Sequence, residues 1–214
     1  REHNLWVGLS FGNKWFTKEN TEQLIKFALE YTKESLLILV PGRLFTTNFR
    51  YFDRLSRSQA LKKAFEAEDQ KMEEVKEIVS RLSQENRNKI TITNYDGILT
   101  PQTIKQREIL MREFAEQGEF YNLVMEIANE ISELRGRTTS KDRSESVALY
   151  VLQELPLFLN GISKIETKII YTVVLYPGLG KLDDLVTKII NDKNFIKLKA
   201  KLELKNKTGI ASVE

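Results

Sequence analysis

The chain of 214 residues contains no cysteine, and its only histidine is His3. The absence of cysteine excludes disulfides, thiolate zinc sites and cysteine nucleophiles, so nothing points to an oxidising compartment. We therefore expect a cytoplasmic protein. Because the single histidine lies at the N-terminal end, a metal site is poorly supported, and we expect no metal.

Long hydrophobic runs and the common nucleotide-binding motifs are missing as well. No apolar run approaches the roughly 20 residues of a membrane-spanning helix, so we expect no membrane partner. Neither G-x-G-x-x-G nor G-x-x-x-x-G-K-[S/T] occurs, which removes the usual phosphate cradles of cofactor-binding proteins. The length, without a repeat or a Pro-rich linker, predicts one domain over residues 1–214.

The numbers of basic and acidic residues are nearly equal over the whole chain, but basic residues are concentrated in one region. The net charge of +3, from 33 basic and 30 acidic side chains, does not by itself indicate a nucleic-acid-binding protein. Between residues 43 and 63, however, the only acid is Asp53, and six side chains are basic: Arg43, Arg50, Arg54, Arg57, Lys62 and Lys63. This region is either a phosphate-attracting surface or a plain solvated face.

The hydrophobic pattern predicts an α/β fold. Four short apolar runs are typical of buried strands, and they are residues 5–10, 36–41, 89–95 and 168–176. Helical patterns cover residues 17–33, 58–85, 100–134 with a possible break near Gly118, and 144–159. We expect a mainly parallel sheet flanked by helices. The last segment, 196–205, alternates apolar and charged residues with a period of two, which predicts an edge strand.

Residues 5–17, LWVGLSFGNKWFT, contain a candidate nucleophile. The segment Gly8–Gly12 fits the Gly-x-Ser-x-Gly elbow, in which a serine at a strand end gives its proton to a histidine later in the chain. No histidine follows Ser10. An esterase of the α/β-hydrolase type is therefore nearly eliminated.

Residues 148–161, ALYVLQELPLFLNG, contain a candidate acid–base pair. On a helix Tyr150 and Glu154 lie four residues apart on one face, among apolar neighbours that tend to raise the pKa of a carboxyl group. Such a carboxylate suits proton transfer near neutral pH, whereas the alternative is a tyrosine–glutamate pair at the margin of the core. Pro156 would normally end or kink this helix.

Tyr176 ends a predicted strand just before Pro177 and Gly178. In open α/β sheets ligands bind outside the carboxyl ends of strands. Ser10 and Tyr176 both occupy such ends, so we expect them to share a site. A tyrosine that only packs at the strand end is the alternative.

These three stretches, in this order, resemble the tRNA-dependent cyclodipeptide synthases. The family pattern has Gly-x-Ser after the first strand, then Tyr-x-x-x-Glu-[Leu/Met]-Pro, then a tyrosine near the end of a later strand. The matching residues are Gly8, Ser10, Tyr150, Glu154, Leu155, Pro156 and Tyr176. The resemblance implies a Rossmann-like fold similar to the catalytic domains of class I tyrosyl- and tryptophanyl-tRNA synthetases, without a cofactor, and we expect a monomer.

The resemblance also implies an activity. Two aminoacyl-tRNAs per cycle would give a cyclic dipeptide, a 2,5-diketopiperazine, by a ping-pong route in which Ser10 carries the first aminoacyl group as an ester. Tyr150 and Glu154 would hold its α-amino group, with Glu154 assisting proton transfer, and Tyr176 would position groups around the serine oxygen. An aminoacyl-tRNA is already an activated ester, which would explain why no histidine is needed.

Further residues follow from the same motifs. The substrate-binding positions would be Trp6, Gly8, Asn13, Leu157 and Val174, and the basic residues between 43 and 63 would face the tRNA. Asn13 together with Pro177 mixes features of two groups within the family. The helix that is strongly basic in many members carries acids here, including Glu66 and Glu68. A non-catalytic tRNA-binding module on a synthetase-like fold is the alternative function.

Overall fold

A computed structural model describes residues 3–134, 141–164, 169–177, 181–204 and 209–213. Within these ranges one sheet contains the strands β1 (Asn4–Gly8), β2 (Leu36–Val40), β3 (Ile90–Asn94), β4 (Ile162–Lys164), β5 (Ile169–Pro177) and β6 (Gly209–Val213). The strand order is β3-β2-β1-β5-β4, and β6 also pairs with β5. Only the pairing of β4 with β5 is antiparallel among the described strands, which confirms the predicted mainly parallel sheet.

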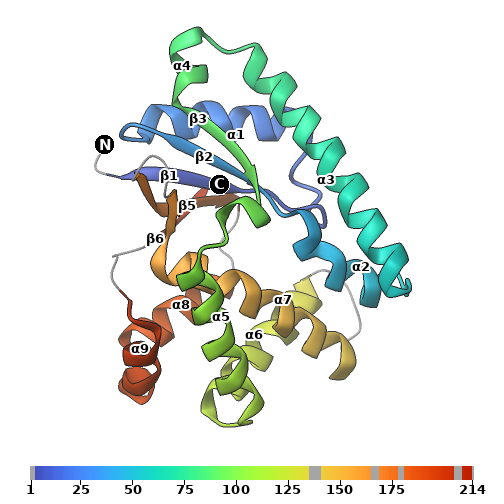
Figure 1. Cartoon of the computed structure of the whole chain (residues 1–214), viewed down its shortest axis with the longest axis vertical. Coiled ribbons are helices and arrows are strands. Elements are labelled where there is room, and N and C mark those ends of the chain that lie inside the picture. Colours follow the sequence, from blue (N-terminus) through green and yellow to red (C-terminus); the bar gives the residue numbers. More distant parts are fainter. Residues whose placement is uncertain (1–2, 135–140, 165–168, 178–180, 205–208, 214) are drawn as a thin grey trace.

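Helices lie on both sides of this sheet (Figure 1). They are α1 (Lys18–Tyr31), α2 (Thr46–Phe52), α3 (Arg57–Ser80), α4 (Gln84–Lys89), α5 (Pro101–Ala115), α6 (Glu119–Leu134), α7 (Lys141–Asn160), α8 (Lys181–Asn191) and α9 (Ile196–Leu202), with short 3-10 turns η1 (Gly42–Phe45), η2 (Asp96–Ile98) and η3 (Lys193–Phe195). In Figure 1, α1 overlaps β2 and β3, α3 runs down the right side of the sheet, and α5 to α9 lie below the strands. In the described part of the chain, no helix has the length and apolar character needed to cross a membrane.

Local sequence signals explain where the helices begin. Thr17 caps α1 by accepting from the backbone N–H of Asn20, and Ser56 forms a capping box with Gln59 at the start of α3. Gly118 separates α5 from α6, which confirms the predicted break. The short helix α2 and the strands β4 and β6 were not predicted.

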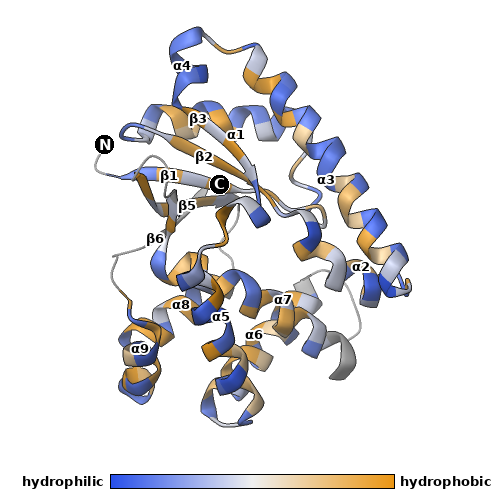
Figure 2. Ribbon diagram, viewed as in Figure 1, coloured by the Kyte–Doolittle hydropathy of each residue, from blue (hydrophilic) through white to orange (hydrophobic). Residues whose placement is uncertain are grey.

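The central strands are buried on both faces. On β2, Leu36, Ile38 and Val40 pack with α1 and α3, whereas Leu37 and Leu39 face the cluster that includes residues of α7. Apolar residues accordingly occur along the strands, whereas α3 alternates hydrophilic and hydrophobic residues (Figure 2). A sheet covered on both faces needs apolar side chains at successive positions of its strands. The apolar runs from which the strands were predicted have this pattern.

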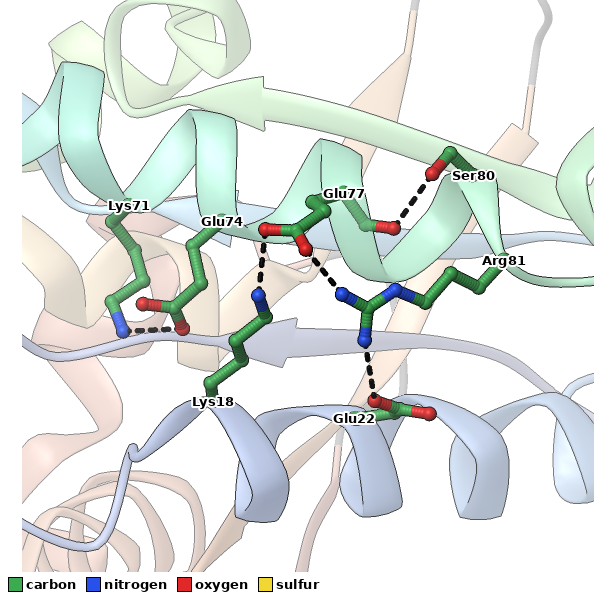
Figure 3. Close-up of polar contacts among 7 residues, drawn as sticks. All are labelled: Lys18, Glu22, Lys71, Glu74, Glu77, Ser80 and Arg81. Atoms are coloured by element: carbon green, nitrogen blue, oxygen red, sulfur yellow. Dashed lines mark hydrogen bonds and ion pairs between the residues drawn. The ribbon is translucent and has the colours of Figure 1, made fainter.

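Ion pairs connect α1 with α3 along their exposed edges (Figure 3). Lys18 Nζ lies 2.6 Å from an oxygen of Glu77, and Arg81 contacts both Glu77 and Glu22. Exposed pairs of this kind each add little to stability, so the apolar contacts beneath them hold the helices together.

Helix α3 is also bonded to the segment that follows Ser10. Lys71 Nζ donates to the backbone carbonyl of Phe16 at 3.1 Å and pairs with Glu74 at 2.8 Å (Figure 3). The lysine is largely buried, so this contact is shielded from solvent. The segment between β1 and α1 is therefore held against α3.

The predicted edge strand over 196–205 is wrong, because its described residues begin with the helix α9. Leu198 and Leu202, four residues apart, are buried against the helical cluster, whereas Ile196 is 57% exposed. Burial thus follows the helical spacing and not the alternation of the sequence. Lys199 Nζ and the backbone carbonyl of Ile190 form a hydrogen bond of 2.7 Å that ties α9 to α8.

Candidate active site

Ser10 lies just beyond the carboxyl end of β1. The N–H of Leu9 donates to the carbonyl of Leu39, which extends the pairing with β2 up to the serine. The serine is only 5% exposed, and its Oγ has no hydrogen-bond partner among the residues described. An unpaired buried hydroxyl costs about 1–3 kcal/mol, so such groups are uncommon outside functional sites.

The turn after Ser10 is held by Asn13. Its Oδ1 accepts a hydrogen bond of 2.9 Å from the N–H of Trp15, and its carbonyl accepts from the N–H of Phe16. These bonds give Asn13 a local structural role. A direct contact with substrate stays a prediction.

The predicted pocket residues lie in one cluster. Trp6, Leu157 and Val174 are buried together with Tyr150. At Gly8 a Cβ would come within 3.1 Å of the Trp6 ring, so the glycine leaves room for the indole. The cluster therefore joins β1, β5 and α7 beside the serine.

Tyr150 and Glu154 form the predicted pair on α7. The phenol donates to Glu154 Oε1 at 2.8 Å. The ring of Tyr150 lies 5.5 Å from that of Phe45, which in turn lies 5.1 Å from that of Phe11, the residue after Ser10. A series of aromatic contacts thus connects the acid–base pair with the serine segment.

Tyr176 lies at the same sheet edge as Ser10. Leu175 pairs with Val7 in the parallel register of β1 and β5, so Tyr176 follows at the level of Gly8. Its ring contacts that of Phe16 at 5.6 Å. The structure therefore places both predicted strand-end hydroxyls on one edge, as the sequence predicted.

Another tyrosine at this edge was not among the predicted site residues. Tyr95 directly follows β3, and its hydroxyl donates to the backbone carbonyl of Gln153, the residue before Glu154. Burial, followed by the negative charge of Glu154, raises the pKa of Tyr95 to about 12, although Arg107 acts in the opposite direction. The hydroxyl is therefore protonated at neutral pH and available as a donor. The strand-end rule that indicated Ser10 and Tyr176 would also have indicated Tyr95.

A cavity of about 510 Å³ is lined in part by Tyr95. Its lining includes no acid, and it contains Tyr95, Gln153 and four arginines, which are Arg43, Arg50, Arg57 and Arg107. Four guanidinium groups around one cavity favour a ligand with several negative charges.

The six predicted basic residues are thus divided. Three line the cavity, and Arg54, Lys62 and Lys63 do not. Lys63 pairs with Asp53 at 2.8 Å, and Lys62 with Glu66 at 3.7 Å. Arg107 was not predicted, because it lies on α5, more than forty residues beyond the basic region.

The described residues contain no group of three or more His, Asp or Glu side chains that could hold a metal ion. The site consists instead of hydroxyl groups and one carboxylate, next to a cationic cavity. This set suits acyl transfer from a substrate that carries phosphates.

Comparison with known proteins identifies the family. A family model described as cyclodipeptide synthase matches residues 1–191. The chain belongs to the cyclodipeptide synthase family. Members of this family are tRNA-dependent aminoacyltransferases, so membership favours an enzyme over the non-catalytic alternative. A comparison with curated protein sequences gives no match.

Solved cyclodipeptide synthases share the fold. A cyclodipeptide synthase from Staphylococcus haemolyticus is 20% identical, with a TM-score of 0.72 over 90% of this chain and 84% of that one. A Mycobacterium tuberculosis protein, described as showing that cyclodipeptide synthetases are related to type I tRNA synthetases, is 14% identical, with a TM-score of 0.65 over 90% and 79%. The enzyme from Candidatus Glomeribacter gigasporarum, described as bound to Phe-tRNAPhe, is 12% identical, with a TM-score of 0.58 over 99% and 86%.

Proposed function

We propose that this chain forms a cyclic dipeptide from two aminoacyl-tRNAs by a ping-pong route with an aminoacyl ester on Ser10. The observation that carries the proposal is the buried Ser10 hydroxyl, which has no partner among the described residues, at the sheet edge of a cyclodipeptide synthase. Tyr150 and Glu154, bonded to each other on α7, would supply the polar groups that hold and deprotonate an amine.

In the first step, Ser10 Oγ attacks the ester carbonyl of the first aminoacyl-tRNA. A new ester bond to Oγ forms, and the bond to the ribose oxygen breaks. The serine proton passes to that ribose oxygen, with the neighbouring ribose hydroxyl as relay. No strong base is needed, because one ester replaces another.

In the second step, the α-amino group of the Ser10 ester attacks the second aminoacyl-tRNA. A peptide bond forms and the bond to the ribose oxygen of the second tRNA breaks. Glu154 takes a proton from the amine and passes it to that oxygen as the tRNA leaves. The free amino group of the dipeptide then attacks the ester on Ser10, which closes the ring and returns the hydroxyl to the serine. Tyr150 would hold the amine through its hydroxyl, and Tyr176 would orient groups around the serine oxygen.

The tRNA partner is supported by charge as well as by similarity. The relative from Candidatus Glomeribacter gigasporarum is described as bound to Phe-tRNAPhe. In the present chain Arg43, Arg50 and Arg57 line a cavity without acids, and Arg54, Lys62 and Lys63 add exposed charge on and before α3. We assign these groups to tRNA phosphates, with an affinity that falls as salt rises.

The proposal is tested with the purified chain and pools of charged tRNA. Mass spectrometry should detect a cyclic dipeptide, and a covalent aminoacyl group should appear on the wild-type protein but not on Ser10→Ala. Absence of product for every amino-acid mixture, while another cyclodipeptide synthase works in parallel, would contradict the activity. Equal acylation of wild type and Ser10→Ala would contradict the nucleophile.

A further inference from the structure

We propose that Tyr95 is a positioning residue for Glu154, which it orients through the backbone of α7. The inference rests on the proposed function, because it assigns Glu154 the proton transfer of the second step. Its basis is a hydrogen bond between two elements that are far apart in the sequence. Tyr95 directly follows β3, and its hydroxyl donates to the carbonyl of Gln153.

The position of Tyr95 is well fixed. Its side chain is 2% exposed and belongs to the same apolar cluster as Tyr150 and Leu157. The backbone after it turns at once into η2. A hydroxyl held this firmly can define where the Gln153 carbonyl lies, and hence how the adjacent Glu154 is presented.

Pro156 makes this turn of α7 dependent on outside support. Proline has no N–H, so the carbonyl of Leu152 loses its usual partner four residues later, and the ring crowds that carbonyl. The helix nevertheless continues to Asn160. The turn that contains Glu154 therefore lacks one of its own hydrogen bonds, and Tyr95 adds one to the next carbonyl, that of Gln153.

The same turn is held from both sides of Glu154. Tyr150 donates to the carboxylate itself at 2.8 Å, and Tyr95 donates to the backbone one residue earlier. Arg107 acts to lower the pKa of Tyr95, and both residues line the arginine cavity. The residue that orients Glu154 is thus also a wall of the proposed phosphate site.

The test is Tyr95→Phe in the full chain, with the two chemical steps measured separately. Acylation of Ser10 by the first aminoacyl-tRNA should stay within about twofold of wild type, since Glu154 is not needed there. Formation of the cyclic dipeptide should slow by roughly 10- to 100-fold, the range expected when a catalytic group is misplaced by a fraction of an ångström to about 1 Å.

Tyr171→Phe is the matched control. Tyr171 is also fully buried, but its hydroxyl bonds to Ser35 Oγ at 2.9 Å and not to α7. Both steps should remain near wild type in this variant. The thermal melting of the two variants is compared. Partial unfolding would lower the rates of both steps together, so a loss in the rate of cyclic dipeptide formation alone indicates a positioning role.

A second variant tests the role of Pro156. Pro156→Ala restores the missing N–H, so Tyr95→Phe should cost less in that background than in wild type. The inference would be overturned if Tyr95→Phe slowed cyclic dipeptide formation equally in the wild-type and Pro156→Ala backgrounds. It would also be overturned if Tyr95→Phe changed both chemical steps alike, or changed neither. A wild-type protein that makes no cyclic dipeptide would instead overturn the proposed function.

Discussion

Tyr150 donates a 2.8 Å hydrogen bond to Oε1 of Glu154, one turn later on α7. The bond fixes one oxygen of the carboxylate. It also brings together two residues that the motif alone could place only on one face of a helix.

We expect Glu154→Gln to separate the two steps of the proposed reaction. The amide can still accept a hydrogen bond from Tyr150 but cannot take a proton, so cyclic dipeptide formation should fall by roughly 10²–10⁴-fold. The aminoacyl ester on Ser10 should still form and accumulate, as intact-protein mass spectrometry would show. Rapid turnover in this variant would remove Glu154 from the proton transfer.

Arg107→Met should weaken binding of aminoacyl-tRNA. The loss of one phosphate contact should reduce affinity roughly tenfold at low salt and lower the slope of log K against log salt by about one. Titrations at several salt concentrations measure both quantities. Arg112→Met is the control on the same helix, because Arg112 is exposed, pairs with Glu108 and does not line the cavity. Equal losses in both variants would point to general charge rather than to the cavity.

Gly42→Ala should destabilise the fold. Gly42 has a φ of +53°, and a Cβ there would overlap the buried carboxylate of Glu68. Backbone strain together with displacement of that carboxylate should cost about 2–4 kcal/mol in urea denaturation. Gly118→Ala, where a Cβ would meet nothing within 4 Å, should leave stability nearly unchanged. A neutral Gly42→Ala would show that α3 can move away from η1 easily.

Glu77→Gln should change stability in a pH-dependent way. A hydrogen bond from Lys18, then the charges of Lys18 and Arg81, hold the pKa of Glu77 below its usual 4.5 in the folded state. The stabilisation is therefore present above about pH 4.5 and is lost as the pH falls through the lower folded pKa. The variant should be slightly less stable than wild type at neutral pH, and the two should converge in denaturant titrations once the pH lies below the lowered pKa of Glu77.

Glu73→Gln is the control for this ion pair. Glu73 pairs with Lys76 inside α3 and makes no link to α1. A loss as large as that of Glu77→Gln would mean that the connection between the helices is unimportant.

The sequence predicted the hydroxyl groups of the site better than its cationic part. Ser10, Tyr150, Glu154 and Tyr176 follow from strand ends and from helical spacing, both of which are local patterns. Arg107 could not be found in this way, because it reaches the cavity from α5 only through the packing of distant elements. The hydroxyl of Tyr95 bonds to a backbone carbonyl. Every residue has such a carbonyl, so the sequence could not predict this contact.

The error over 196–205 has a similar origin. Alternating apolar and charged residues favour a strand only where a neighbouring strand is present to pair with them. Here the residues pack on helices, and Gln106 Nε2 donates to the carbonyl of Leu202. Tertiary contacts thus decided between two local structures that the pattern left possible.

The burial of Ser10 has a consequence for the fate of the proposed intermediate. An ester at a position that is only 5% exposed is reached by few water molecules, whereas the amine it carries is already in place. Hydrolysis of the ester is then slow compared with arrival of the second tRNA. A shielded ester can persist until a scarce second aminoacyl-tRNA binds. The product yield then depends on the concentration of that tRNA and not on hydrolysis of the ester.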